Sequence, residues 1–264
     1  MNPRYILIAA TALATLAGPS AATAAPQAPK TTVAVFHERG GQLWQSSRTV
    51  AQTSGVAKAA MNALFAGPNA AETAAGVTTA VPAGSRLRGI SVAGGTATVD
   101  VSRKFATAGG RASVRMRLAQ LVFTATQFPT VHRVRLEVAG QVVHSIAGVP
   151  VPQPGSRPSF YKLVPPILVA QPAIGARIPA TVNITGSADV FEAAVDVRII
   201  NARGRLLART HTLATCGNGC RGTYSVTLRY HVRRAQRGTV VVFDTGGVVA
   251  HPHVVRVPVR LSVG

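Results

Sequence analysis

The sequence predicts an α+β domain of two layers followed by an all-β immunoglobulin-like sandwich. Residues 31–148 mix strand patterns with two amphipathic helices. A proline-rich segment follows at 149–166, and residues 167–264 contain only short strand patterns separated by turns. Helices beside strands and strands alone are typical of these two fold classes.

The first 25 residues have the features of a secretory signal peptide. Arg4 supplies a positive charge, residues 6–16 form an apolar run, and residues 22–24 read Ala-Thr-Ala, a small-residue cleavage site. We predict cleavage near Ala24 or Ala25. The apolar run is too short to span a membrane, which takes about 20 residues. We therefore expect a secreted or extracytoplasmic envelope protein whose mature chain has no transmembrane span.

The chain is strongly basic, with 28 Lys and Arg residues against 8 Asp and Glu. One of these cations, Arg4, lies in the predicted signal peptide, so the mature chain keeps a formal charge of about +19. Such a field attracts polyanions. An exported chain meets wall polymers and anionic lipid surfaces, so we do not expect nucleic acid as the partner. A surface that is basic only for solubility remains the alternative.

The domain at 31–148 begins with a predicted hairpin, with strands over 32–36 and 43–50. A helix is predicted after Ser54 as its N-cap, and Gly67-Pro68 ends it because proline cannot continue the hydrogen-bond ladder. The remaining elements are a polar connection at 69–85, strands at 86–92 and 96–101, a helix from 111 to 128, and strands at 131–138 and 141–146.

The segment 149–166 is predicted to be an extended, semi-rigid tether that lets the two domains take separate orientations. No helical pattern follows it. The second domain is predicted to hold seven strands, at 167–170, 180–186, 191–201, 205–212, 222–230, 238–244 and 253–262.

Cys216 and Cys220 bracket three residues, and we predict a disulfide between them in an oxidising compartment. Closing so small a ring stabilises the fold by about 2 kcal/mol at most. A zinc site needs two further ligands, and His211 is the only candidate near in sequence. A redox motif normally has two intervening residues, not three.

The sequence has none of the motifs of a catalytic site. It lacks a G-x-S-x-G elbow, an H-E-x-x-H helix and a phosphate-binding loop. Its eight carboxylates show no pairing expected of a glycosidase. We therefore predict that the chain is not an enzyme and uses no cofactor or metal. The alternative is a cell-wall (peptidoglycan) hydrolase or a metal-dependent envelope enzyme.

Four individual side chains have a structural and a functional interpretation, and we favour the structural one for each. Asp100 is expected to accept backbone N–H groups in the turn that follows its strand, and Glu192 to lie within an apolar strand. Trp44 is expected in the core or rim of the first hairpin, not as a platform for sugars. His251 and His253 are expected to be a surface pair, not metal ligands.

Several phrases of the first domain closely resemble the sporulation and spore germination (GerMN) domain of bacterial envelope proteins. They are ALFAGP at 63–68, GVTTAVPAG at 76–84, ATVDVS at 97–102 and QLVFTATQFP at 120–129. Phrases of the second domain resemble the immunoglobulin-like domain that often follows it: VNITGSA at 182–188, FEAAV at 191–195 and RGTYSV at 221–226.

This resemblance implies a non-enzymatic role in assembling or contacting the cell envelope, through envelope proteins or anionic wall polymer. In relatives from spore formers such domains serve sporulation and germination. The family's layout is similar to ring-building modules of sporulation channels, which leaves oligomerisation open. The chain departs from lipid-attached relatives because no cysteine follows its apolar run.

A cluster of cations at the second helix is the predicted contact surface. Arg111 and Arg115 lie four residues apart and so on one side of a helix, with Arg103 and Lys104 just upstream. Guanidinium groups bind phosphate or carboxylate in a forked geometry. These four residues are therefore candidates for binding a polyanion or partner, and a merely solvated face remains the alternative.

Overall fold

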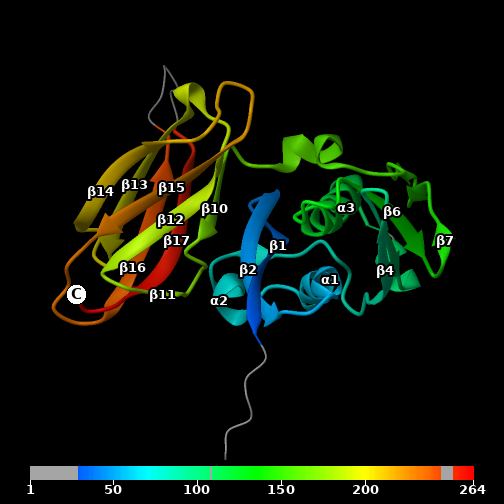
Figure 1. Ribbon diagram of the computed structural model, residues 1–264, viewed down its shortest axis with the longest axis horizontal. Helices are drawn as coiled ribbons and strands as arrows, with labels where there is room; N and C mark the ends of the chain where they lie inside the picture. Colours follow the sequence, from blue (N-terminus) through cyan, green and yellow to red (C-terminus); the bar gives the residue numbers. More distant parts are fainter. Residues whose placement is uncertain (1–28, 108, 245–251) are drawn as a thin grey trace, which may run out of the picture.

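The computed structural model describes residues 29–107, 109–244 and 252–264. The predicted signal peptide, 1–25, lies outside the described residues. An α+β domain and a β-sandwich lie side by side (Figure 1). The predicted classes, an α+β domain followed by an all-β sandwich, are confirmed, but the first domain has three layers, with helices between two sheets, where two layers were predicted.

The first sheet of the α+β domain is antiparallel, in the order β2-β1-β3. Strands β1 (Lys30–Arg39) and β2 (Gln42–Ala51) form the predicted hairpin, which is longer at both ends than the sequence indicated. The turn uses Gly40 and Gly41 at φ of 60° and 78°, a conformation that glycine adopts at little cost. The third strand, β3 (Val77–Thr78), pairs with the end of β1.

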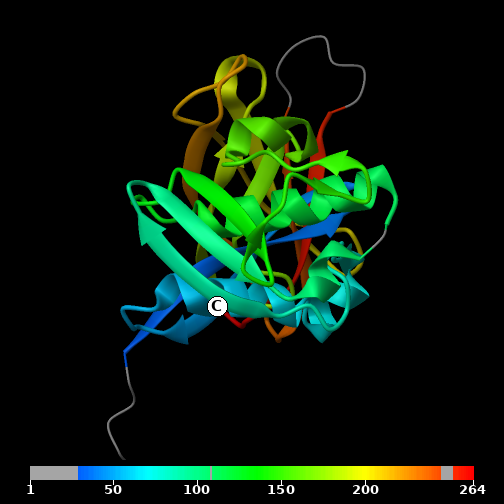
Figure 2. The ribbon, with the colours of Figure 1, turned by 90° about the vertical axis from the view of Figure 1, so that its right-hand side faces the viewer.

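The second sheet has the order β4-β5-β6-β7 and is viewed from its outer side in Figure 2. Its strands are β4 (Leu87–Ala93), β5 (Thr96–Val101), β6 (Arg133–Val138) and β7 (Gln141–Val142). Strands β5 and β6 are parallel, and the helix α3 (Arg111–Ala125) makes the crossover between them.

Helices α1 (Val56–Ala66) and α3 lie between the two sheets (Figure 1). Because α3 contacts β1 and β6 as well as α1, every residue from Met116 to Ala125 is buried. The sequence predicted a single apolar stripe on this helix. Two of the polar residues inside have partners in β1, since Thr124 Oγ1 accepts the Phe36 N–H at 3.0 Å and Gln120 Nε2 donates to the Phe36 carbonyl at 3.2 Å.

Two details of the helices differ from the sequence predictions. The N-cap of α1 is Gly55 and no side chain caps it, so the prediction of Ser54 was wrong. The connection at 69–85 contains a short helix, α2 (Ala70–Ala74), closed by a capping box between Asn69 and Glu72. A 3₁₀ turn, η1 (Arg103–Ala106), and the small strands β8 (Ser145–Ile146) and β9 (Val149–Pro150) complete the domain.

The second domain packs a three-stranded sheet, β10-β12-β15, against a five-stranded one, β11-β17-β16-β13-β14. The seven predicted strands are all present, and β11 (Arg177–Ile178) is additional. They are β10 (Ile167–Gln171), β12 (Thr181–Ala188), β13 (Ala194–Asn201), β14 (Leu206–Leu213), β15 (Gly222–Arg229), β16 (Gln236–Phe243) and β17 (Val254–Leu261).

The start of the predicted strand 191–201 was wrong. Phe191–Ala193 form a 3₁₀ turn, η3, in which Glu192 has a φ of 52° and is exposed. A left-handed residue cannot continue a pleated strand. Glu192 therefore lies outside the strand in which it was expected.

The segment 149–166 is not the extended tether that was predicted. It contains a 3₁₀ helix, η2 (Arg157–Leu163), which contacts α3 and buries Phe160. Burial of an aromatic ring offsets the entropy of ordering such a segment. The segment is therefore part of the folded core.

The two domains also pack directly on each other, so they do not take separate orientations. In β2, Leu43 faces the core of the first domain while the next residue, Trp44, packs into that of the second. In β10, Leu168 faces the first core while its neighbours face the second. Ser47 Oγ donates to the Ala170 carbonyl at 3.1 Å, and Arg39 Nη1 to the Arg256 carbonyl at 2.8 Å.

Candidate functional site

Two of the four predicted contact residues share one pocket. Arg111 and Arg115 line a pocket of about 580 Å³ together with Glu38. Arg115 also makes structural contacts. Its Nη2 donates to the Ser159 carbonyl at 3.3 Å, and its guanidinium lies 5.8 Å from the centre of the Phe160 ring. Both arginines of this pocket are exposed, and Arg115 in addition contacts η2.

The other two predicted residues, Arg103 and Lys104, are exposed on η1 and do not line this pocket. A buried arginine, Arg117, ties η1 to α3 by donating from Nη1 to the carbonyls of Phe105 at 2.7 Å and Thr107 at 3.0 Å. Burial lowers the pKa of Arg117. The predicted cluster is therefore divided.

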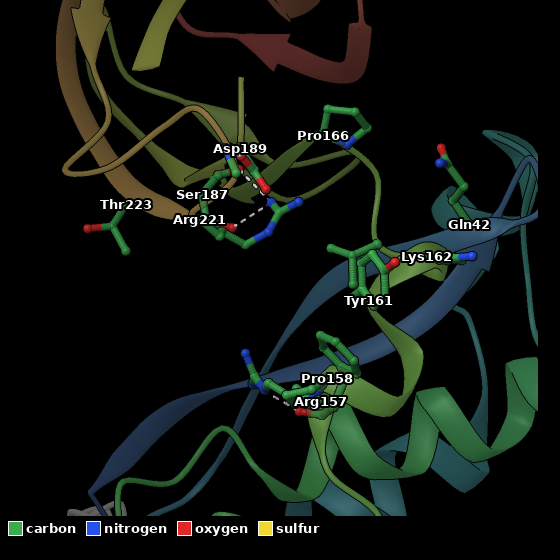
Figure 3. A pocket seen from close by; sticks show the side chains of 13 residues that line it. Gln42, Arg157, Pro158, Tyr161, Lys162, Pro166, Ser187, Asp189, Arg221 and Thr223 are labelled. Atoms are coloured by element: carbon green, nitrogen blue, oxygen red, sulfur yellow. Dashed lines mark hydrogen bonds between the residues drawn. The ribbon is translucent and has the colours of Figure 1, made fainter. Parts of the chain in front are cut away.

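A larger pocket lies at the junction of the two domains. It has a volume of about 860 Å³, which is in the range of small-molecule sites. Its walls come from β2, α3 and η2 of the first domain, from the segment that leads into β10, and from the ends of β12 and β15 with their adjoining loops. Figure 3 shows Arg157 and Arg221 on opposite sides of the opening, with Tyr161 and Lys162 on the connecting segment.

Arg157 is held from the side of the first domain. Its Nε donates to Thr126 Oγ1 at 2.9 Å and its Nη2 to the Phe123 carbonyl at 3.3 Å. The guanidinium also lies 4.8 Å from the centre of the Phe123 ring. Burial lowers the pKa of Arg157, and the positive charge of Arg221 lowers it further.

Arg221 is held from the side of the second domain. Its Nη2 donates to the Pro165 carbonyl at 2.6 Å and its Nη1 to the Ser187 carbonyl at 3.3 Å. Burial lowers the pKa of Arg221, and the negative charge of Asp189 opposes that effect.

The predicted disulfide between Cys216 and Cys220 is present, and its loop forms one wall of this pocket. Gly219 N donates to Asp189 Oδ1 at 2.9 Å, and both residues line the pocket. Asn218 Oδ1 in turn accepts the N–H of Glu192 at 3.0 Å. The disulfide therefore closes a loop that places backbone and side-chain groups at the domain junction.

Sequence reasoning missed the junction pocket. Arg157 and Lys162 fell in the segment predicted to be a tether, and Arg221 was noted only as part of a family phrase. Local patterns do not show which residues of separate domains converge. The available signal was compositional, because two cations and two aromatic residues interrupt a proline-rich segment at 157–162.

Two other titratable residues that were singled out, Asp100 and His253, have structural partners. Asp100 accepts the Gly140 N–H at 2.9 Å and pairs with Arg88 Nε at 2.9 Å, so the turn it holds follows β6 and not its own strand. Burial raises the pKa of Asp100, but these bonds outweigh it and leave the pKa lowered. Asp244 Oδ2 lies 2.9 Å from His253 Nδ1, and His251 lies outside the described residues.

Within residues 29–107, 109–244 and 252–264, no three His, Cys, Asp or Glu side chains gather as a metal site would need. None of the helices in that part of the chain combines the length and the apolar character of a membrane span.

Comparisons with known proteins agree with this domain organisation. Residues 35–144 match the family described as sporulation and spore germination, and residues 166–246 match the immunoglobulin-like domain of bacterial spore germination. The comparison with curated proteins gives no match.

Solved structures that are similar to the chain include two of the same sporulation protein. The first GerMN domain of the sporulation protein GerM from Bacillus subtilis is 18% identical, with a TM-score of 0.40, over 48% of this chain and 98% of that one. The tandem GerMN domains of the same protein are 13% identical, with a TM-score of 0.44, over 88% of this chain and 61% of that one.

A putative lipoprotein from Clostridium perfringens is 16% identical, with a TM-score of 0.38, over 51% of this chain and 93% of that one. By the two family matches, the chain carries a sporulation and spore germination domain followed by an immunoglobulin-like domain of bacterial spore germination.

Proposed function

We propose that the chain is an exported, non-enzymatic protein of the cell envelope that acts as a binding or assembly module for anionic wall polymer or envelope proteins. The observation that carries this proposal is the excess of positive charge. After each of the 8 carboxylates is set against one cation, the mature chain still has a formal net charge of about +19. A charge of this size steers association with polyanions.

The cations are presented by both domains. Exposed arginines of the first domain include Arg103, Arg111, Arg133 and Arg135, and those of the second include Arg203, Arg209, Arg229 and Arg234. Two domains packed as one body offer a wider cationic surface than either alone. An extended polyanion can therefore contact several sites at once, which raises its overall affinity.

The test is co-sedimentation of the mature chain with purified wall sacculi, before and after their anionic polymers are removed. We expect binding at about 20 mM salt and release at about 500 mM, because screening weakens charge attraction. An Arg111→Ala, Arg115→Ala double variant tests the predicted contact surface in the same assay. Failure of the wild-type chain to sediment with intact walls at low salt would contradict the proposal.

The same preparations test catalysis and export. Soluble fragments released from walls, with or without a chelator, would support the hydrolase alternative and contradict a binding role. The chain recovered after expression in an exporting host should begin at Ala25 or Pro26. Retention of residues 1–25 would contradict export through a cleaved signal peptide.

A further inference from the structure

We propose that the junction pocket binds an anionic sugar, with its phosphate or carboxylate group between Arg157 and Arg221 and its ring against Tyr161. This inference rests on the proposed function, because it names the chemical group of the polymer that the chain would hold. It adds a defined site to what would otherwise be diffuse charge attraction.

The charge of the pocket favours an anion. Three of the lining residues are cations, Arg157, Lys162 and Arg221, whereas Asp189 is the acidic residue among those that line it. One oxygen of Asp189 already accepts the Gly219 N–H. The lining is therefore positive by two charges, in a recess where charge interactions are stronger than in open water.

Both guanidinium groups are preorganised. Hydrogen bonds within the described residues occupy Nε and Nη2 of Arg157, which leaves the donors of its Nη1 for a ligand. The hydrogen bonds of Arg221 occupy Nη1 and Nη2, which leaves the N–H of its Nε for a ligand. A ligand would not have to order these side chains on binding, so it avoids much of the usual entropy cost.

The two guanidiniums also repel each other. The charge of Arg221 lowers the pKa of Arg157, which means that the two positive charges interact across the pocket. An oxyanion bound between them offsets this repulsion with two attractions, each of the charge-assisted kind that arginine forms with phosphate and carboxylate.

The rest of the pocket suits a sugar ring. Tyr161 is 66% exposed, and Pro158, Val164 and Pro166 provide apolar surface beside it. An exposed aromatic face with a polar tip can cover the C–H face of a ring while contacting its hydroxyls. An extended peptide fits less well, because Thr223 of the edge strand β15 already bonds Thr215 through both its N–H and its carbonyl.

The test is a ¹H–¹⁵N NMR titration of the full mature chain with defined probes. N-acetylglucosamine 1-phosphate and glucuronic acid present the two anionic groups, N-acetylglucosamine is the neutral counterpart, and triglutamate is the peptide probe. We expect at least one of the two anionic sugars to shift the amide signals of Gly219 and Lys162. The neutral sugar should bind at least tenfold more weakly.

The variants are chosen at exposed positions so that the fold is retained. Lys162→Glu should weaken anionic-sugar binding at least tenfold, whereas Lys58→Glu, the same charge change on exposed α1, should not. Tyr161→Ala should weaken it and Tyr161→Phe should largely retain it, because the ring and not the hydroxyl provides the platform. Arg221→Gln tests the guanidinium directly.

Three outcomes would overturn the inference, and a fourth would overturn only the proposed function. Shifts caused by triglutamate but not by the sugars would indicate an acidic peptide, and shifts insensitive to Lys162→Glu would place binding elsewhere. If walls sediment with both the wild type and Lys162→Glu while no sugar shifts the pocket signals, the proposed function stands and this inference fails. If the anionic sugars bind in the pocket but walls do not sediment with the chain, this inference stands and the proposed function fails.

Discussion

His37 lies in the middle of a polar network that is closed off from water. Its side chain is fully buried in β1, its Nδ1 lies 3.1 Å from Ser46 Oγ, and its Nε2 has no partner among the described residues. Burial lowers its pKa to about 4, with the charge of Glu72 opposing and that of Arg48 adding to the effect. The imidazole is therefore neutral in the folded chain at pH 7.

This residue predicts a loss of stability in mild acid. His37 binds a proton near pH 6.5 in the unfolded chain and only near pH 4 in the folded chain. The stability that the neutral imidazole contributes is therefore fully present above about pH 6.5 and is lost as the pH falls toward 4. From this residue we expect a decrease of about 2 kcal/mol in the free energy of unfolding between pH 7 and pH 5.

Urea unfolding at the two pH values measures this decrease. His37→Gln should remove most of it, whereas His144→Gln, at an exposed histidine, should leave it in place. An equal decrease in the His37→Gln variant and the wild type would show that another group is responsible.

A second buried residue of the network, Glu72, explains why α2 forms. Arg48 contacts both its oxygens, at 2.8 and 2.6 Å, and one of these oxygens also accepts the Asn69 N–H. Burial raises the pKa of Glu72, but the bonds from Arg48, Asn69 and Ser46 outweigh it and leave the pKa lowered. The capping-box pattern at 69–72 is visible in the sequence, and the ion pair with β2 is not.

At the scale of elements, the three-stranded sheet of the sandwich depends on a glycine. Gly186 of β12 lies opposite Val169 of β10 and Tyr224 of β15. The Tyr224 hydroxyl passes this position to donate to the Leu168 carbonyl at 3.0 Å. A Cβ on residue 186 would collide with that carbonyl and with the tyrosine.

Gly186→Ala should therefore destabilise the chain by about 2 kcal/mol, since overpacking forces side chains or strands apart. Gly89→Ala is the matched control, because a Cβ on this strand residue meets nothing within 4 Å. Thermal unfolding followed by circular dichroism compares the two. A Gly186→Ala chain as stable as the control would show that the sheet can adjust at this point.

At the scale of the whole molecule, Trp44 is a large side chain that joins the domains. It is the only tryptophan of the chain, is 8% exposed, and packs with the core of the second domain although it belongs to the first. The Arg39 guanidinium covers its ring at 4.7 Å and bonds the second domain through Arg256.

Trp44→Ala should uncouple the domains. We expect a loss of about 3–5 kcal/mol, as for other large aromatic truncations, and two separate calorimetric transitions where the wild type shows one. Leu43→Ala, one residue earlier, removes a side chain from the core of the first domain and should destabilise without separating the transitions. A single transition in Trp44→Ala would show that the remaining contacts suffice to couple the domains.

Most elements of the fold could be predicted from the sequence, but the pocket at the junction of the two domains could not. Turn glycines at 40–41, the helix stop at Gly67-Pro68 and the alternation in the second domain are local signals, so the elements and their class could be predicted. Arg111 and Arg115 could be placed on one helix face for the same reason. The partners of that face, Glu38 and η2, could not be inferred because they are distant in the sequence.

The sequence by itself determined the two domain types, their order, the disulfide loop and the excess of positive charge. Only the tertiary structure decided that β2 and β10 each face two cores, that the proline-rich segment folds onto α3, and that Arg157 and Arg221 converge. The physical reason is that local propensity and period depend on near neighbours. Burial of Trp44 and Phe160, by contrast, depends on surfaces that exist only after both domains have folded.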